Sequence, residues 1–338
     1  MKTRLAKTNE AKKIMLFIKT YWSKNHILAN NLELFLKFYK KNSKNLNIII
    51  CNKNKSIISI LGFVDYNQYS KIEHSSVWLA LWFTSNKYPS SGILVLNYLT
   101  KKFKTRNIFG LGLTEKALSV LQKYGFKSGV MNHYFKLNIN FKNKFKVLQN
   151  YNNISIKNYK KQNSKKNIRF VEAKLKDLKN VSFLKKNEKN LQYIKSKFLN
   201  NSYYNYEIYL ITINFNEELI VILREIQVKD SNILRVVDII GNLSLLKYTD
   251  EFFNSILSQK NAEYIDFLNY GIPESYLTKL GFLKLNHKSN IIIPNYFEPF
   301  IPKNKIINYA YLLNNQKNKK IYINKADGDQ ERPNKLLN

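Results

Sequence analysis

The chain has 338 residues, enough for two domains of ordinary size, and its 44% apolar content excludes an intrinsically disordered protein. Its net charge of +33 comes mainly from lysines that are spread along the whole chain, and asparagine is abundant as well. This spread favours a compositional bias over a nucleic-acid-binding face, although so strong a charge attracts anions such as phosphates. The one cysteine, Cys51, excludes an internal disulfide and a cysteine metal site, and no metal is predicted.

The N-terminal residues lack an apolar segment behind their charges, so we expect no signal peptide. No apolar run reaches the roughly 18 residues that a membrane-spanning helix needs. The sequence therefore predicts a soluble, cytoplasmic protein, in agreement with its low cysteine content.

Residues 47–138 and 207–297 pass through a similar order of predicted elements. Each half reaches a short helix that ends in Lys-x-Gly-Phe, at residues 123–126 and 279–282. The repetition predicts two copies of one α/β unit, and such a repeat limits where a ligand can bind.

Apolar periodicity and turn residues define the elements of the first half. In chain order, they are helices at 8–22 and 31–39, a hairpin of strands 47–51 and 56–64, a buried strand at 76–84, a helix at 93–103, a strand at 106–113, a helix at 114–124 and a closing strand at 132–137.

The second half repeats this order. It is predicted to contain helices within 171–199, a hairpin of strands 207–213 and 218–226, a buried strand at 234–240, a helix at 245–259, a strand at 263–268, a helix at 274–280 and a final strand at 289–293. We therefore predict an N-terminal domain at 1–140, a Lys/Asn-rich linker at 141–168 and a C-terminal domain at 169–338 that ends in an acidic motif.

This order of elements resembles the GNAT acyltransferase fold. The resemblance rests on the buried strand with its glycine turn into a helix, at 82–92 and 238–241, and on the two Gly-Phe helix ends. It implies two tandem GNAT-like domains, each a mixed, mainly antiparallel sheet flanked by helices. It also implies an acyl-CoA cofactor, with acetyl-CoA as the first candidate, whose pyrophosphate is bound at a helix N-terminus and whose acyl group lies between two strands.

The resemblance places the cofactor loop at Lys87, Ser90, Ser91 and Gly92, a weak match to the family pattern of Arg/Gln-x-x-Gly-x-Gly/Ala. Many members carry a tyrosine four residues before the glycine of Gly-Phe, as the acid for the leaving thiolate. Both halves have leucine there. The resemblance therefore supports the family's fold in this chain more strongly than it supports the family's usual catalytic residues.

The chain also resembles acyltransferase-like proteins encoded with bacterial surface-polysaccharide genes. This second resemblance rests on Trp22 with residues 26–29, on the strand 77–82, on His133 with Tyr134, and on the tail Asp-Gly-Asp-Gln-Glu-Arg-Pro-Asn at 327–334. It implies a sugar or nucleotide-linked sugar as acceptor.

Amide formation from a thioester needs a base, donors to an oxyanion and a proton for the thiolate. His26, after the first helix, is either a base near the acceptor pocket or a capping histidine, and His133 is a weaker candidate. Asp238 and Asp266 interrupt apolar strands that would be neighbours, where a carboxylate is costly unless it is paired. They either face one pocket as general base and amine ligand, or form core ion pairs with Arg224 or Arg235.

The tail carries Asp327, Asp329, Glu331 and Arg332 within six residues. Either this segment folds over the pocket of Asp238 and Asp266 and binds hydroxyls or an amine, or it is a disordered acidic tail. Trp82 is a candidate for the substrate pocket wall, although core packing explains such aromatic residues as well.

We therefore predict an acyltransferase that modifies a sugar or nucleotide-linked sugar in surface-polysaccharide synthesis. One alternative is a transferase resembling the Fem peptidyltransferases, which also use two GNAT-like units and take amino acids from charged tRNA. The other is a non-catalytic module that binds a sugar nucleotide or glycan. Small molecules are the expected partners and nucleic acid is not, while the sequence leaves open which half is active.

Overall fold

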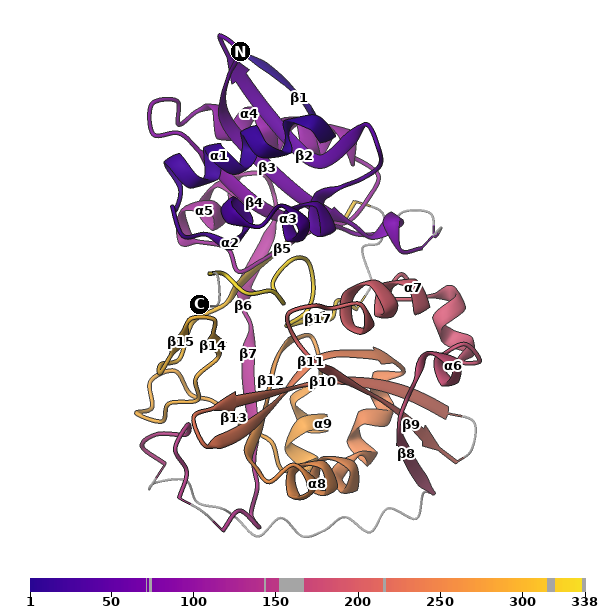
Figure 1. Cartoon of the computed structure of the whole chain (residues 1–338). Coiled ribbons are helices and arrows are strands. Elements are labelled where there is room, and N and C mark those ends of the chain that lie inside the picture. The colour runs from indigo at the N-terminus through magenta and orange to yellow at the C-terminus, as the bar shows by residue number, and fades with distance from the viewer. Residues whose placement is uncertain are drawn as a thin grey trace. The chain divides into compact units, whose positions relative to one another are not determined.

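The computed structural model describes residues 1–70, 72, 75–142, 144–151, 167–214, 217–314 and 320–335. The chain forms two compact units (Figure 1). Unit 1 comprises Met1–Gly129, Ile307–Lys319 and Asp327–Asn338, and unit 2 comprises Val130–Ile306 and Lys320–Ala326. Each unit has its own sheet flanked by helices, which confirms the predicted α/β fold class. Within the described residues, no helix is long and apolar enough to cross a membrane.

Unit 1 contains, in chain order, β1 (Lys2–Lys7), a 3-10 turn (Thr8–Glu10), α1 (Ala11–Tyr21), α2 (Ile27–Asn30), α3 (Leu32–Tyr39), β2 (Asn45–Lys53), β3 (Ser56–Asp65), a 3-10 turn (Tyr66–Gln68), β4 (Val77–Thr84), α4 (Ser91–Lys102), β5 (Ile108–Leu111), α5 (Glu115–Lys123), β6 (Lys127–Val130) and β16 (Asn308–Leu312). The strand order is β1-β2-β3-β4-β5-β16-β6. The β4–β5 pair is parallel, whereas β1–β2, β2–β3, β3–β4 and β5–β16 are antiparallel.

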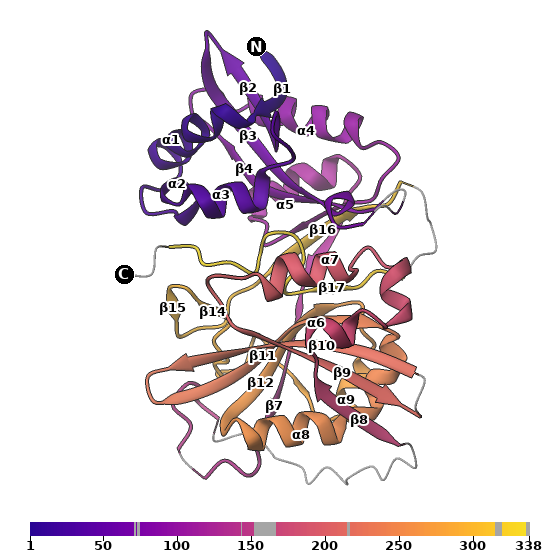
Figure 2. The same cartoon turned by 45° about the vertical axis from the view of Figure 1, so that its right-hand side comes forward.

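Helices cover both faces of the unit 1 sheet. Leu61 of β3 points to the face where Leu96 of α4 and Leu121 of α5 complete the apolar core. The next residue, Gly62, faces the other way, and a Cβ there would lie 2.8 Å from the ring of Tyr39 on α3. Figure 2 shows α1, α2 and α3 on one side of this sheet and α4 on the other.

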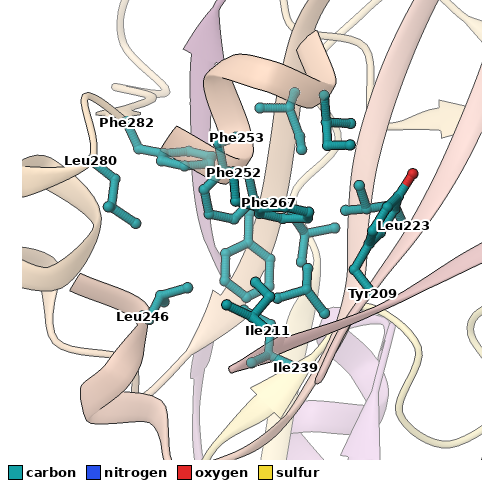
Figure 3. Packing of buried hydrophobic residues seen from close by; sticks show 14 of the residues in the cluster. Tyr209, Ile211, Leu223, Ile239, Leu246, Phe252, Phe253, Phe267, Leu280 and Phe282 are labelled. Carbon is teal, nitrogen blue, oxygen red and sulfur yellow. The ribbon is translucent and has the colours of Figure 1, made fainter. Parts of the chain in front are cut away.

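Unit 2 contains, in chain order, β7 (Asn132–Leu137), β8 (Ile168–Glu172), α6 (Leu175–Leu178), a 3-10 turn (Ser182–Lys186), α7 (Leu191–Ile194), a π-helical turn (Lys195–Leu199), β9 (Tyr206–Ile213), β10 (Glu217–Val228), β11 (Ser231–Gly241), a 3-10 turn (Leu243–Tyr248), α8 (Asp250–Gln259), β12 (Ala262–Tyr270), α9 (Glu274–Lys279), β13 (Leu283–Lys284), β14 (Tyr296–Phe297), β15 (Phe300–Ile301) and β17 (Ile323–Asn324). The main sheet has the order β13-β7-β12-β11-β10-β9-β8, with β17 paired to β12. Figure 3 shows its core, where Phe252 and Phe253 of α8 pack against Phe267 of β12.

The predicted domain boundaries differ from this division. The chain enters unit 2 after Gly129, and two segments near the C-terminus return to unit 1. The reason is that residues 132–137, predicted to close the first domain, form β7 and pair with β12 and β13 of unit 2. Most of the predicted linker, residues 152–166, lies outside the described residues.

The predicted final strand at 289–293 is also wrong. Ile292 forms only an isolated bridge with Gln149, because β7 already lies beside β12 at that position of the sheet. In unit 1, the corresponding place between β5 and β6 is filled by β16, far away in the sequence. Periodicity identified β7 as a strand but could not identify its partner.

The repeated Gly-Phe motif is a helix cap in both units. Gly125 has φ +81° and Gly281 has φ +79°, a left-handed conformation that favours glycine. The amide of the following residue, Phe126 or Phe282, donates to a carbonyl in the last helical turn at 3.1 Å. Each motif follows a strand, β5 or β12, that pairs in parallel with β4 or β11. The strands predicted at 106–113 and 263–268 therefore occupy equivalent places in the two units.

The position of β16 predicts that unit 1 needs this C-terminal strand. Ala310 is fully buried and pairs with Gly110, so Ala310→Asp should lower the free energy of unfolding by about 3–5 kcal/mol, because it buries an unpaired charge. Ile306, just before the strand, is 61% exposed, and Ile306→Asp is the matched control. Urea denaturation followed by tryptophan fluorescence measures both variants; equal stability would contradict the assigned role of β16.

Candidate functional site

A β-bulge in β4 creates an opening at the end of the unit 1 sheet. Leu81 and Trp82 lie together opposite the single residue Leu61 of β3, and Leu81 adopts φ +43°. A bulge bends its strand, and the pairing of β4 with β5 ends at Leu79 and Gly110. Beyond that point the two parallel strands separate, as the resemblance implies for an acyl-binding wedge.

A pocket of about 350 Å³ lies where β4 ends and α4 and α5 begin. It combines an aromatic wall with several hydroxyl and amide groups. Its lining consists of Trp22, Trp82, Phe83, Thr84, Ser85, Asn86, Pro89, Gly92, Ile93, Thr114, Lys116, Ala117 and Val120. Among the described residues that line it, none is a carboxylate or a histidine.

Helix α5 contributes to this pocket, which was not predicted from the sequence. Thr114 caps α5 by accepting a hydrogen bond from the Ala117 amide at 3.3 Å, and Lys116 lies exposed in the first turn. The strand order accounts for this contribution, because β4 and β5 are parallel neighbours and their carboxyl ends meet at one edge of the sheet. Helices that start at this edge direct their N-termini, and so their partial positive charge, toward the same opening.

Of the four predicted cofactor residues, Gly92 lines the pocket. A Cβ at Gly92 would lie 2.8 Å from Thr84 Oγ1, so this glycine allows α4 to approach the end of β4 closely. Ser91 is fully buried and its hydroxyl donates to the Tyr88 carbonyl at 2.7 Å. Lys87 and Ser90 are exposed side chains of the preceding loop.

The backbone amides at the start of α4 already have partners. Those of Ser91, Gly92 and Ile93 donate to the carbonyls three residues earlier, at 3.0, 3.4 and 3.1 Å. A phosphate group bound here would therefore depend more on side-chain donors such as Lys116 than on these amides.

His26 supports one wall of the pocket without lining it. Its ring lies 4.9 Å from that of Trp22, which in turn stacks on Phe83 with the rings 5° from parallel. His26 Nδ1 accepts a hydrogen bond from the Leu28 amide at 3.2 Å and thereby caps α2. The proton of the neutral ring must then sit on Nε2, so the ring has no free acceptor for a substrate proton.

The pKa of His26 agrees with a capping role. Burial, followed by the nearby Arg332 guanidinium, lowers this pKa from 6.5 to about 4, and Asp329 only partly opposes the shift. A neutral histidine with so low a pKa is a weak base at neutral pH.

In unit 2, the predicted residues His133 and Asp266 come together in a buried ion-pair cluster. Arg235 donates to both oxygens of Asp266 at 2.9 and 2.7 Å, and His133 Nε2 lies 2.9 Å from Asp266 Oδ2. Burial alone would raise the pKa of the Asp266 carboxyl, but Arg235 and His133 outweigh it and the pKa lies below its usual value. Asp266 therefore matches the core-ion-pair alternative, with Arg235 as its partner.

Asp238 is held by a different set of partners. It is fully buried and accepts hydrogen bonds from Lys189 at 2.8 Å, Tyr193 at 2.7 Å, Asn324 at 2.7 Å and the Ile239 amide at 2.9 Å. Each carboxylate is thus compensated separately within unit 2, and these contacts do not combine the two into one acceptor site.

The acidic tail motif is ordered and belongs to unit 1. Tyr66 donates to Asp327 at 3.0 Å, Tyr39 donates to Asp329 at 3.1 Å, and Arg332 pairs with Asp329 at 3.1 Å. These contacts hold the tail residues beside α3 and β4 of unit 1. Within the described part of the chain, no group of three or more His, Cys, Asp or Glu side chains is placed to bind a metal ion.

The low pKa of His26 predicts a pH-dependent loss of stability. In the unfolded chain the ring protonates near pH 6.5, whereas in the folded protein it stays neutral until about pH 4. Stability is therefore fully present above pH 6.5 and declines as the pH falls toward 4, by about 3 kcal/mol. His26→Asn keeps a capping side chain without the titration and should flatten this decline in urea denaturation series. Parallel curves for both proteins would refute the assignment.

The Asp266 cluster predicts an asymmetric response to mutation. Asp266→Asn leaves the buried Arg235 charge without its counterion and should cost about 3–5 kcal/mol of stability. The double variant Asp266→Leu with Arg235→Met removes both charges and should recover much of that loss. Urea denaturation monitored by circular dichroism compares the two, and a double variant as unstable as the single one would contradict an ion-pair role.

No family model and no curated protein sequence matches the chain. Among solved structures, a GCN5-related N-acetyltransferase from Anabaena variabilis matches with a TM-score of 0.56 and 10% identity, over 93% of this chain and 73% of that chain. An aminoglycoside 6'-N-acetyltransferase complexed with coenzyme A matches with a TM-score of 0.30 and 14% identity, over 38% of this chain and 87% of that chain. The match to the Anabaena protein shows that the chain has the fold of the GCN5-related N-acetyltransferases.

Proposed function

We propose that the chain is an acyltransferase that takes an acyl group from acyl-CoA, with acetyl-CoA as the first candidate, and that the pocket of unit 1 is its site. The observation that carries the proposal is the open pocket at the diverging ends of β4 and β5, between the starts of α4 and α5. Solved proteins of this fold include acetyltransferases in complex with coenzyme A.

The side chains of the pocket suit coenzyme A better than the backbone amides at the start of α4 do. Trp82, Phe83 and Ile93 offer an apolar wall for the thin pantetheine chain, and Gly92 leaves space beside Thr84. Lys116 supplies positive charge for the phosphates at the pocket itself, with Lys87 in the exposed loop as a second cation. The amides of the α4 start contribute less than the resemblance implies, because they are bonded within the chain.

The pocket lining favours an amine over a hydroxyl as the acceptor. A hydroxyl needs a base to become nucleophilic, and the described lining residues include no carboxylate and no histidine. An amine that has already lost its proton to the solvent is nucleophilic without an enzyme base, so positioning it against the thioester accounts for most of the rate enhancement required. Leu121, where many members of the family carry a tyrosine acid, is fully buried in the core.

For the acceptor we propose an amino sugar or its nucleotide-linked form, as used in surface-polysaccharide synthesis. Trp22 is 41% exposed and stacks flat on Phe83 at the pocket, which offers an aromatic surface for one face of a sugar ring. The net charge of +33 also attracts the phosphates of a nucleotide sugar.

The cofactor site is tested by Gly92→Leu. A side chain there would meet Thr84 and fill the pocket, so coenzyme A affinity measured by calorimetry should fall at least tenfold, or about 1.4 kcal/mol. The matched control is Ser56→Leu, an exposed position at the start of β3 that is not among the residues lining the pocket and should keep normal affinity. Circular dichroism confirms that both variants are folded. Unchanged affinity in Gly92→Leu would place the cofactor elsewhere.

The absence of a base from the described pocket lining predicts the pH dependence of turnover. The rate should rise with pH and follow the pKa of the acceptor amine, shifting when amines of different pKa are compared. A profile that stays fixed across acceptors would reveal an enzyme base and would contradict the positioning mechanism.

A thermal-shift screen separates this proposal from its alternatives. Stabilisation by CoA thioesters supports the acyltransferase. Salt-sensitive binding of charged tRNA would support a Fem-like transferase instead, and stabilisation by nucleotide sugars without turnover would support a binding module.

A further inference from the structure

Unit 2 contains the same kind of opening as unit 1. On β11, Val237 is an extra residue between two regular pairs, Ile222 with Asp238 and Leu223 with Val236. The parallel pairing of β11 with β12 ends immediately before this bulge, at Val236. The two strands then separate, as β4 and β5 do in unit 1.

In unit 2 the opening contains a segment of the chain itself. On one side, β17 pairs antiparallel with β12 through Asn324 with Asn269 and Ile323 with Tyr270. On the other side, the Ala326 amide donates to the carbonyl of the bulge residue Val237 at 2.9 Å. The segment is thus hydrogen bonded to both separated strands.

Side chains and close backbone contacts hold the segment in place. Asn324 donates its side-chain amide to Asp238 at 2.7 Å, and Lys197 donates to the Ala326 carbonyl. Ile323 and Ala326 are fully buried. A Cβ at Gly271, which has φ +93°, would lie only 1.9 Å from the Ile321 carbonyl oxygen, so this approach requires glycine.

We infer that the cleft between β11 and β12 is a binding site for an extended peptide strand, filled by residues 321–326 of the same chain, and that unit 2 consequently binds no acyl-CoA. The part that concerns the cofactor rests on the proposed function. The chain then binds one acyl-CoA, in unit 1, where the pocket at the corresponding opening is about 350 Å³.

The physical reason is competition for one place. A ligand entering between β11 and β12 would have to remove β17, break its hydrogen bonds to both strands and leave Asp238 without its Asn324 partner. A segment of the same chain also competes at a high effective concentration, in the millimolar range or above for a short tether.

Two measurements on the full chain test the inference. Native mass spectrometry and calorimetry count the coenzyme A molecules bound: we expect one for the natural chain, and at least tenfold weaker binding at that single site for Gly92→Leu. Hydrogen exchange then follows the Ala326 amide, which should exchange at least a thousandfold more slowly than an unstructured amide, with no change when coenzyme A is added.

Asn324→Asp provides a targeted perturbation. It places a second carboxylate against Asp238, so the Ala326 amide should exchange at least tenfold faster than in the natural chain. The control is Asn290→Asp, at an unrelated position of unit 2, which should leave this exchange rate unchanged.

The outcomes separate the two proposals. A second coenzyme A molecule that persists in Gly92→Leu, an unprotected Ala326 amide, or loss of its protection on adding coenzyme A would each overturn the inference. If no coenzyme A binds to the natural chain, the proposed function fails, while the exchange of Ala326 still decides whether the strand fills the cleft.

Discussion

One extra residue controls the arrangement of each unit. It lies in the strand that follows the β2–β3 hairpin in unit 1 and the β9–β10 hairpin in unit 2. A β-ladder cannot absorb an unpaired residue without bending, so the bulges at Leu81 and Val237 turn β4 and β11 away from their parallel neighbours. The backbone cost of φ +43° at Leu81 is tolerated because the surrounding sheet fixes the conformation. The pocket of unit 1 and the segment bound in unit 2 both lie at these openings.

Different groups occupy the two openings. In unit 1, side chains from β4, α4 and α5 surround a pocket and leave space for a ligand. In unit 2, backbone groups of residues 321–326 restore hydrogen bonds that the separated strands had lost. Backbone polar groups in a buried position need partners, and a ligand or a strand of the chain can supply them.

Both sheets also depend on strands that are remote in sequence. β16 completes unit 1 from near the C-terminus, and β7 completes unit 2 from the end of the first repeated half. Tyr134 and Phe135 of β7 pack into apolar clusters on the two faces of the unit 2 sheet, which accounts for its place there. The two repeated halves of the sequence are therefore not the two structural units, although within each half the order from the hairpin to the Gly-Phe helix end is as predicted.

The sequence by itself determined the α/β class, the repeated order of elements and the helix ends at Gly125 and Gly281, because these follow from local periodicity and from a backbone conformation that favours glycine. It also showed that Asp238 and Asp266 each required compensation. Only the tertiary structure showed that Arg235 forms an ion pair with Asp266. It likewise decided which strands pair and which opening stays free, because pairing between distant segments depends on complementary surfaces that no local pattern encodes.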